Sequence, residues 1–311
     1  MDVEIVSRIE KLKKELNAII LAHNYQPPQV QDIADFVGDS LELSIKAMQS
    51  NAKVIVFAGV DFMAEQAAVL NENSTVLHPE PDAKCPMASM ISVEDVEKAV
   101  RKYPGAPVVM YVNSPAAVKA LANYVVTSAN AVNLVKALDS ETIIFGPDKH
   151  LAEYVAEKTG KNVVAVPEHG HCPVHVKFSL EEITCLKSIY RNCVFIAHPE
   201  CPRAVRSQAD FVGSTSQMIE FVKRSSARTF LVGTEVGIIY RMAKEAREKV
   251  FIPASTKAIC DDMKKITLEK ILSSLVSKSY VMKIDRAVAE KVRKAIENTF
   301  DVLGVSRPWR K

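Results

Sequence analysis

Short apolar runs alternate with amphipathic stretches along most of the chain. Ala18–Leu21 and Val54–Phe57 are continuously apolar, whereas Leu41–Gln49 and Val60–Leu70 carry apolar side chains at helical spacing. Short, fully apolar strands separated by helices are typical of parallel sheets that are covered on both faces. The pattern therefore predicts an α/β fold in which strands and helices alternate.

The same order of elements recurs three times. The first strands of the three units are predicted at Ala18–His23, Pro107–Val112 and Cys193–His198, and the third strands at Val54–Gly59, Thr142–Gly146 and Thr229–Gly233. The glycines that end the third strands are 87 residues apart in both steps, and the segments 35–40, 123–128 and 210–215 superpose at a similar spacing. Self-similarity at a constant period of this length is typical of duplicated small domains. We predict three homologous α/β domains.

The repeats are expected at residues 18–105, 106–191 and 192–280. An N-terminal helix in residues 1–17 precedes them, and residues 281–311 follow them. Each repeat should hold four strands and a trailing helix, the helices being predicted at Val93–Tyr103, Glu181–Tyr190 and Leu268–Leu275. A last helix at about Arg286–Phe300 has no counterpart in the earlier repeats, so we expect it to pack back on the body as a closing element.

Composition narrows the class of protein. The chain has 311 residues, of which 48% are hydrophobic and 25% charged, an ordinary balance for a globular protein with more than one core. A net charge of +3 argues against a nucleic-acid binder that relies on a dominant basic field. No apolar run approaches the roughly 18 residues of a membrane span, and the first 16 residues alternate charged and apolar positions, unlike a signal peptide. We expect a cytoplasmic protein whose six cysteines are free thiols or metal ligands.

Three of the cysteines are in register with the repeat. Cys172 lies 87 residues after Cys85 and 88 residues before Cys260, and each of the three follows a predicted fourth strand. Ligand sites of open parallel sheets lie beyond the carboxyl ends of the strands. Three thiolates on one axis could hold a 4Fe-4S cluster through three irons, or a zinc ion with an open position, and the residues alone leave both open.

The other cysteines break the register. Free cysteines are often simply buried, and we expect this of Cys185 on a helix face and Cys193 in a strand. Cys201 follows Glu200, which we expect in the ligand site, and we assign Cys201 no role.

Polar side chains follow the other strands. His23, Tyr25, Tyr111, Asn113, His198 and Glu200 come after first strands, and Ser40, Ser128 and the pair Ser214–Thr215 open helices after second strands. Serine and threonine are preferred helix N-caps anywhere, but three caps around one cavity would present three positive helix ends to anions. No phosphate-binding glycine loop or dinucleotide fingerprint occurs, so we expect the anions of small substrates.

Histidines add proton-transfer chemistry. A lone histidine at a strand end usually just makes hydrogen bonds. His23, His175 and His198, however, fall at predicted strand ends together with Tyr25, Tyr111 and Glu200. Such a set suits acid–base catalysis, with Glu200 as the main acid or base because it follows an apolar strand and faces a closed pocket.

These residues lie in segments that closely resemble the quinolinate synthases over nearly the whole chain. The segments are AHNY at 22–25, GDS at 38–40, CPMASM at 85–90, YVN at 111–113, HPEC at 198–201, GSTSQM at 213–218 and GTEVG at 233–237. The resemblance implies a triangle of three three-layer α/β/α domains with parallel sheets, related by pseudo-threefold symmetry. It also implies an oxygen-sensitive 4Fe-4S cluster on the axis, with one iron free of protein ligands.

Residue roles carry over by position. The cluster ligands would be Cys85, Cys172 and Cys260. The substrate site would be lined by His23, Tyr25, Ser40, Tyr111, Asn113, Ser128, His175, His198, Glu200 and Thr215, with Tyr25, His198 and Glu200 as catalytic groups. Some members of the family carry a regulatory cysteine pair near the third ligand, but here Asp261, Asp262 and Met263 follow Cys260, so a disulfide switch is not expected.

The implied reaction joins iminoaspartate to dihydroxyacetone phosphate and yields quinolinate, phosphate and water for NAD biosynthesis. Its steps are carbon–carbon bond formation, ketose-to-aldose isomerisation, ring closure through an imine and dehydration, and the open iron would act as a Lewis acid on a leaving hydroxyl. An aspartate-oxidising enzyme that supplies iminoaspartate is an expected partner.

Other classes share part of this pattern. Diphthamide-forming radical enzymes and the reductase that dehydroxylates a branched isoprenoid diphosphate also combine three domains with three cluster cysteines. The set of Tyr25, Tyr111, Asn113 and Glu200 favours the synthase. A cluster-bearing redox sensor or electron carrier is the non-enzymatic alternative, but it would not need a cavity lined by so many hydroxyls and histidines.

Overall fold

The computed structural model describes residues 3–306, and its strands form three four-stranded parallel sheets. The first sheet contains β1 (Ala18–His23), β2 (Phe36–Gly38), β3 (Val54–Ala58) and β4 (Thr75–Leu77) in the order β2-β1-β3-β4. The second contains β5 (Val108–Tyr111), β6 (Tyr124–Val126), β7 (Thr142–Gly146) and β8 (Asn162–Ala165), and the third contains β9 (Val194–Ala197), β10 (Phe211–Val212), β11 (Thr229–Gly233) and β12 (Val250–Pro253). Each of these sheets repeats the order of the first, which confirms three α/β units.

The repeat extends to side chains that support the sheet edges. The residue just before each second strand binds a backbone N–H of the first strand. Asp35 Oδ2 accepts from Ile20 at 2.7 Å, Asn123 Oδ1 from Val108 at 2.7 Å, and Asp210 Oδ2 from Phe195 at 2.8 Å. Three equivalent bonds at equivalent positions are expected of a duplicated unit.

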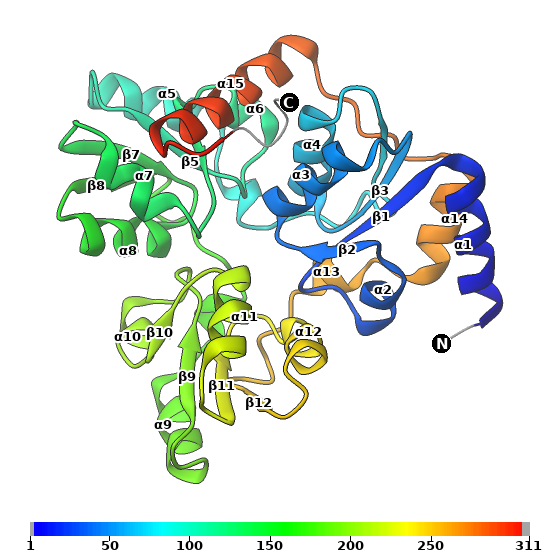
Figure 1. Cartoon of the computed structure of the whole chain (residues 1–311). Helices are drawn as coiled ribbons and strands as arrows, with labels where there is room; N and C mark the ends of the chain where they lie inside the picture. The colour runs from blue at the N-terminus through cyan, green and yellow to red at the C-terminus, as the bar shows by residue number, and fades with distance from the viewer. Residues whose placement is uncertain (1–2, 307–311) are drawn as a thin grey trace.

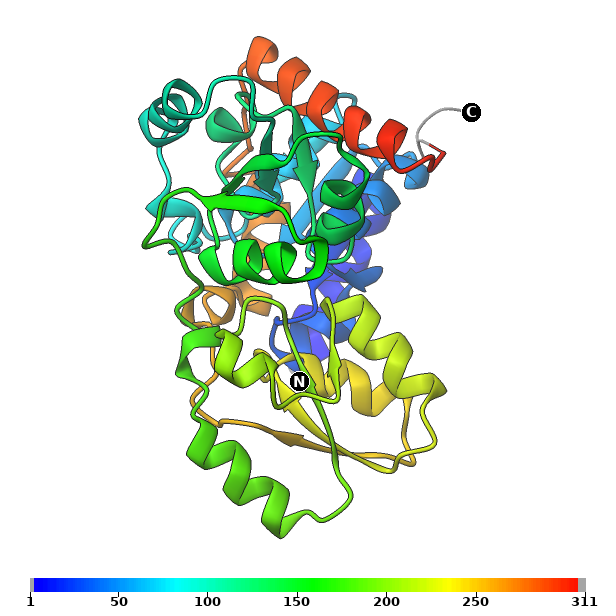
Figure 2. The same cartoon turned by 90° about the vertical axis from the view of Figure 1, so that its left-hand side faces the viewer.

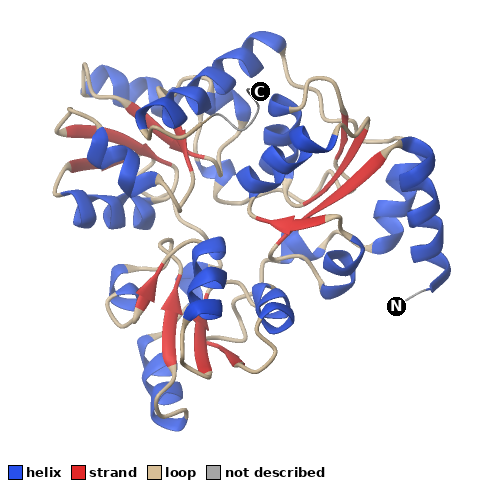
Figure 3. Ribbon diagram, viewed as in Figure 1, coloured by secondary structure: helices blue, strands red, loops and turns tan. Residues whose placement is uncertain are grey.

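Helices cover both faces of the sheets, and the three units lie around a common centre as a triangle (Figures 1 and 3). The longer helices are α1 (Val3–Leu16), α3 (Ser40–Ser50), α4 (Asp61–Leu70), α7 (Ala131–Ala137), α8 (Lys149–Thr159), α11 (Thr215–Arg224) and α12 (Ile238–Glu245). Short helices that the sequence pattern did not indicate follow the first strands: α2 (Pro28–Ile33), α6 (Ala116–Lys119) and α10 (Arg203–Arg206). A segment of four to six residues is too short to show helical periodicity, which explains why they were missed.

The trailing helix of each repeat packs against the sheet that follows it. Helix α5 (Val93–Lys102) shares a core with Val108 and Ile144, and α9 (Leu180–Ile189) contributes Ile183 to the core of the third sheet. Helix α14 (Leu268–Ser277) returns to the first sheet, where it packs against α1. This arrangement closes the ring of three units. The exact domain boundaries stay a prediction.

The last helix, α15 (Arg286–Val302), spans the first and second units (Figure 2). It packs on β6, α6 and α4, and Thr299 Oγ1 donates to the backbone oxygen of Val125 at 2.8 Å. The last helix therefore packs back on the first and second units.

A buried arginine ties the second unit to the third. Arg206 donates to Glu153 and Glu157 of α8 at 2.9 Å each, and its guanidinium lies 5.2 Å from the centre of the Tyr154 ring. A planar guanidinium that donates to two carboxylates of one helix holds two surfaces in one orientation.

No helix in the described part of the chain is long and apolar enough to cross a membrane.

Candidate active site

A central cavity lies where the carboxyl ends of the three sheets meet. The space open to the centres of water-sized molecules in it is about 80 Å³. All but one of the site residues predicted from the sequence line it, and they come from all three units: His23, Tyr25, Cys85, Tyr111, Asn113, Ser128, Cys172, His175, His198, Glu200, Thr215 and Cys260. The side chain of Ser40 lies outside the described part of the structure. Parallel strands of all three sheets thus deliver their terminal residues to one place, as the topology predicts.

The three in-register cysteines reach the cavity from loops that follow the fourth strands. A single helical turn comes soon after each: η1 (Ala88–Met90), η2 (His175–Lys177) and α13 (Asp261–Lys264). All three cysteines are free thiols. Burial raises the pKa of each, to about 11 for Cys260, so bare thiolates are disfavoured in this cavity unless a positively charged group compensates them.

The three cysteines outside the register differ in how far they are buried. Cys185 is exposed, so the expectation that it belongs to a core is wrong, because the predicted helix face points to solvent. Cys193 is half-buried just before β9 and packs against the core of the third unit. Cys201 is buried, with its Sγ 3.3 Å from the backbone oxygen of Gly233.

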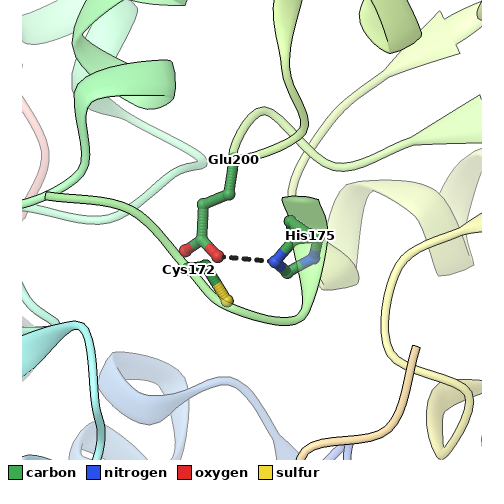
Figure 4. Close-up of side chains that lie close together, drawn as sticks. All are labelled: Cys172, His175 and Glu200. Carbon is green, nitrogen blue, oxygen red and sulfur yellow. Dashed lines mark ion pairs between the residues drawn. The ribbon is translucent and has the colours of Figure 1, made fainter. Parts of the chain in front are cut away.

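The Glu200 side chain points toward His175, and Cys172 lies beside the pair (Figure 4). Its Oε1 accepts a hydrogen bond from the Tyr111 hydroxyl at 2.7 Å, and its Oε2 lies 2.8 Å from Nδ1 of His175. Burial opposes ionisation of the carboxyl, but the imidazoles of His198 and His175 and the hydroxyl of Tyr111 outweigh it and hold the pKa of Glu200 below its usual range. The side chain is therefore a buried carboxylate.

Thr234 was missed by the sequence analysis, although it extends this network. Its hydroxyl oxygen is 2.7 Å from the Tyr25 hydroxyl and 2.8 Å from Nε2 of His175, and the side chain is buried. Polar contacts therefore run without a break from Tyr25 through Thr234, His175 and Glu200 to Tyr111. Thr234 directly follows the third strand of its repeat, so its position in the sequence could have identified it. The sequence analysis assigns roles only to residues that follow the first, second and fourth strands.

Two histidines share one local geometry. Nδ1 of His23 accepts from the backbone N–H of Tyr25 at 3.2 Å, and Nδ1 of His198 accepts from that of Glu200 at 3.3 Å. A ring whose Nδ1 accepts carries its proton on Nε2. Burial lowers the pKa of both to about 3, helped at His23 by the Lys264 cation. Both are therefore neutral donors and not the cations that an anion site would favour.

The helix starts differ from the expectation of three serine or threonine caps. Only Ser214 caps its helix, by accepting from the backbone N–H of Gln217. Asp39 caps α3 in place of Ser40, and α7 begins after Asn130, two residues beyond Ser128. The expectation of three equivalent serine or threonine caps is therefore wrong, and at the first start an aspartate side chain stands where an anion was expected.

Thr215 is nevertheless oriented toward the cavity. Its Oγ1 accepts from the amide of Asn24 at 3.0 Å, and the carbonyl of that amide accepts from Arg241 at 2.7 Å. Because its oxygen already accepts one bond, the hydroxyl keeps its proton available to a ligand.

Two sets of side chains could hold a metal. The first is the trio of thiols. The second is Cys172, His175 and Glu200, whose ligand atoms lie within 4.8 Å of one another. In the second set, Nε2 of His175 contacts Thr234, and Nδ1 lies 2.8 Å from Glu200 Oε2 without hydrogen-bond geometry. The thiols are the freer donors, and soft sulfur ligands fit an iron–sulfur cluster.

Comparison with known proteins identifies the family. A model of the quinolinate synthetase A protein family matches residues 7–301. Proteins named quinolinate synthase are similar over 96% of this chain: one from Pyrococcus abyssi is 52% identical and one from Thermotoga maritima 49%, each covered over 100% of its length. Another from Methanocaldococcus jannaschii is 48% identical and covered over 98%. The chain therefore belongs to the quinolinate synthetase A family.

Proposed function

We propose that this protein condenses iminoaspartate with dihydroxyacetone phosphate to form quinolinate, phosphate and water, using a 4Fe-4S cluster held by Cys85, Cys172 and Cys260. The observation that carries the proposal is the convergence of three free, half-buried thiols, one from each unit, on a cavity that also contains Glu200 and its partners. Membership of the family favours this reaction over the other cluster enzymes and over a redox sensor.

The residues fit such a cluster. Three thiols approach from three directions, so they can bind three corners of a cubane and leave the fourth iron to the substrate side. Iron binding would offset the cost of deprotonating the thiols in a buried cavity. With the cluster bound, its open iron supplies a Lewis acid for the departure of a substrate hydroxyl.

Glu200 is the proposed base. A carboxylate whose pKa is lowered stays ionised at neutral pH, and it faces the cavity, where protons must be removed from carbon during isomerisation and condensation. The adjacent His175 lies 2.8 Å away and can take up the proton in turn. His198 stacks on His175, with ring centres 4.7 Å apart, which fixes the plane of both rings.

Tyr25 and Tyr111 are proposed to donate hydrogen bonds without losing their protons. Burial, followed by the charge of Glu200, raises the pKa of both hydroxyls well above the ordinary value. Neutral hydroxyls next to a carboxylate can donate to carbonyl or imine groups of the substrates. The Nε2–H groups of His23 and His198 add two further donors, as expected for a site that binds carboxylates.

Anionic groups of the substrates would bind to hydroxyls and amides. Ser128, Asn113 and Thr215 line the cavity, and Thr215 has a hydroxyl proton that its Asn24 contact leaves free. We expect an aspartate-oxidising enzyme to supply iminoaspartate, because an imine of this kind hydrolyses readily in water.

The proposal is tested by anaerobic purification followed by iron and sulfide analysis and an assay for quinolinate. About four irons and four sulfides per chain and formation of quinolinate are expected. Stoichiometric zinc, or one metal ion bound by the set of Cys172, His175 and Glu200, would refute the cofactor assignment. A full cluster without quinolinate would refute the reaction.

A further inference from the structure

Each repeat carries a buried or half-buried carboxylate that binds the backbone of its own in-register cysteine. The carboxylates are Asp61, Asp148 and Glu235, each two residues after the glycine that ends the third-strand segment. The N–H of Cys85 donates to Asp61 Oδ1 at 3.0 Å, that of Cys172 to Asp148 Oδ2 at 3.1 Å, and that of Cys260 to Glu235 Oε1 at 3.2 Å. The proposed cluster ligands are thus tied to a second set of equivalent residues.

The same carboxylates also bind the start of the helix that follows the third strand. Asp148 Oδ1 accepts from the N–H of Leu151 at 2.6 Å as the cap of α8, and Asp61 Oδ1 accepts from the N–H of Phe62 at 2.9 Å. Glu235 Oε2 accepts from the N–H of Gly237 at 2.7 Å. Each carboxylate therefore joins a cysteine loop to a rigid helix start behind it.

Helix capping alone does not account for the arrangement. A cap needs only the N–H groups of its own helix, whereas each of these side chains also binds an N–H 24 or 25 residues further along the chain. In the third repeat the spacing to the cysteine is one residue longer, and there the shorter aspartate is replaced by glutamate. The hydrogen bond to the cysteine N–H is therefore present in all three repeats, although the acceptor is a glutamate in the third and an aspartate in the other two.

The surroundings of Glu235 strengthen this contact. Lys264 lies 2.8 Å from Glu235 Oε1 and also contacts the backbone oxygen of Tyr25. A Cβ at Gly237 would come within 2.8 Å of Glu235, Lys264 and Tyr25, so only glycine allows the three to approach. The third cysteine loop is therefore packed against a residue of the substrate cavity.

We propose that Asp61, Asp148 and Glu235 are positioning residues for the cluster: each holds the ligand loop of its repeat in the binding conformation before the cluster is present. The inference rests on the proposed function. Partners that orient metal ligands typically change metal affinity by about 10–100-fold when removed. A loop that is already ordered also loses less conformational entropy on binding.

Asp148→Asn is the most informative variant. Asparagine caps helices as well as aspartate does, so the bond to Leu151 can be kept while an NH2 group replaces the oxygen that faces the N–H of Cys172. The matched control is Asp285→Asn, because Asp285 caps α15 by accepting from Val288 and is exposed to solvent. Glu235→Gln makes the same test in the third repeat should Asp148→Asn fail to fold.

The experiment measures the rate at which an iron chelator removes the cluster from anaerobically reconstituted protein, followed by loss of cluster absorbance. Asp148→Asn and Glu235→Gln should lose the cluster about 10–100 times faster than wild type while the cluster-free proteins remain folded, and Asp285→Asn should match wild type. Rates of cluster loss within twofold of wild type in both test variants would overturn this inference and leave the proposed function standing. Wild-type protein that takes up no cluster would overturn the proposed function with it.

Discussion

Replacing Thr234 by valine tests whether the polar network between Tyr25 and His175 takes part in catalysis. Valine has nearly the shape of threonine, so a buried side chain is exchanged without leaving a cavity. The change removes one hydroxyl that is 2.7 Å from the Tyr25 hydroxyl and 2.8 Å from Nε2 of His175. His175 is buried and Tyr25 is half-buried, so each loses a partner that water cannot easily replace.

The magnitude follows from these two contacts. A buried polar group left without a partner costs about 1–3 kcal/mol, so the free energy of unfolding should fall by about 2–6 kcal/mol at most. A positioned acid or base contributes about 10²–10⁴-fold to the rate, and here the proposed base Glu200 stays in place. We therefore expect a smaller loss in kcat, of about 10–100-fold, caused by misorientation of Tyr25 and His175.

The assay is anaerobic quinolinate formation at matched cluster content, with Thr234→Ser as the control. Serine keeps the hydroxyl and loses only a methyl group, so it should recover most of kcat. Urea unfolding of both variants separates stability from catalysis. Wild-type kcat in Thr234→Val, or equal losses in the valine and serine variants, would refute the reasoning, because the second result would assign the effect to packing of the methyl group.

Three further predictions concern the cysteines, the base and pH. Replacing Cys85, Cys172 or Cys260 by serine should abolish the cluster, whereas Cys185→Ser, on the surface, should keep wild-type iron content; a full cluster in Cys172→Ser would contradict the ligand assignment. Glu200→Gln should lower kcat by about 10²–10⁴-fold with unchanged iron content, and an active variant would remove Glu200 from the mechanism. The pKa of His23 is about 3 in the folded state and 6.5 in the unfolded state, so the unfolded chain binds more protons between these two pH values. The free energy of unfolding that is present above pH 6.5 is therefore lost as the pH falls toward 3. At pH 5 the loss is about 2 kcal/mol for this group, and urea unfolding of the cluster-free protein should show a flatter pH dependence in His23→Gln; an identical pH dependence would argue against a buried neutral ring.

Much of the site was predictable because the repeat places equivalent residues at equivalent strand ends. The spacing of Cys85, Cys172 and Cys260 already indicated three thiols on one axis, and all three line one cavity in the structure. Glu200 and Tyr111 were expected to meet for the same reason, and they do so at 2.7 Å. Such predictions depend only on strand periodicity and on the rule that parallel strands end at the same edge.

The sequence by itself determined the α/β class, the three repeats and the side chains delivered to the strand ends, because these follow from local patterns that recur along the chain. Only the tertiary structure decided which side chains meet across units. The bridging position of Thr234, the carboxylate behind each cysteine and the return of α14 to the first sheet all depend on packing between segments far apart in the chain. The exposure of Cys185 and the cap at Asp39 were decided in the same way, since a helix face is buried or exposed by its neighbours, and the cap is the side chain whose oxygen reaches the free N–H groups.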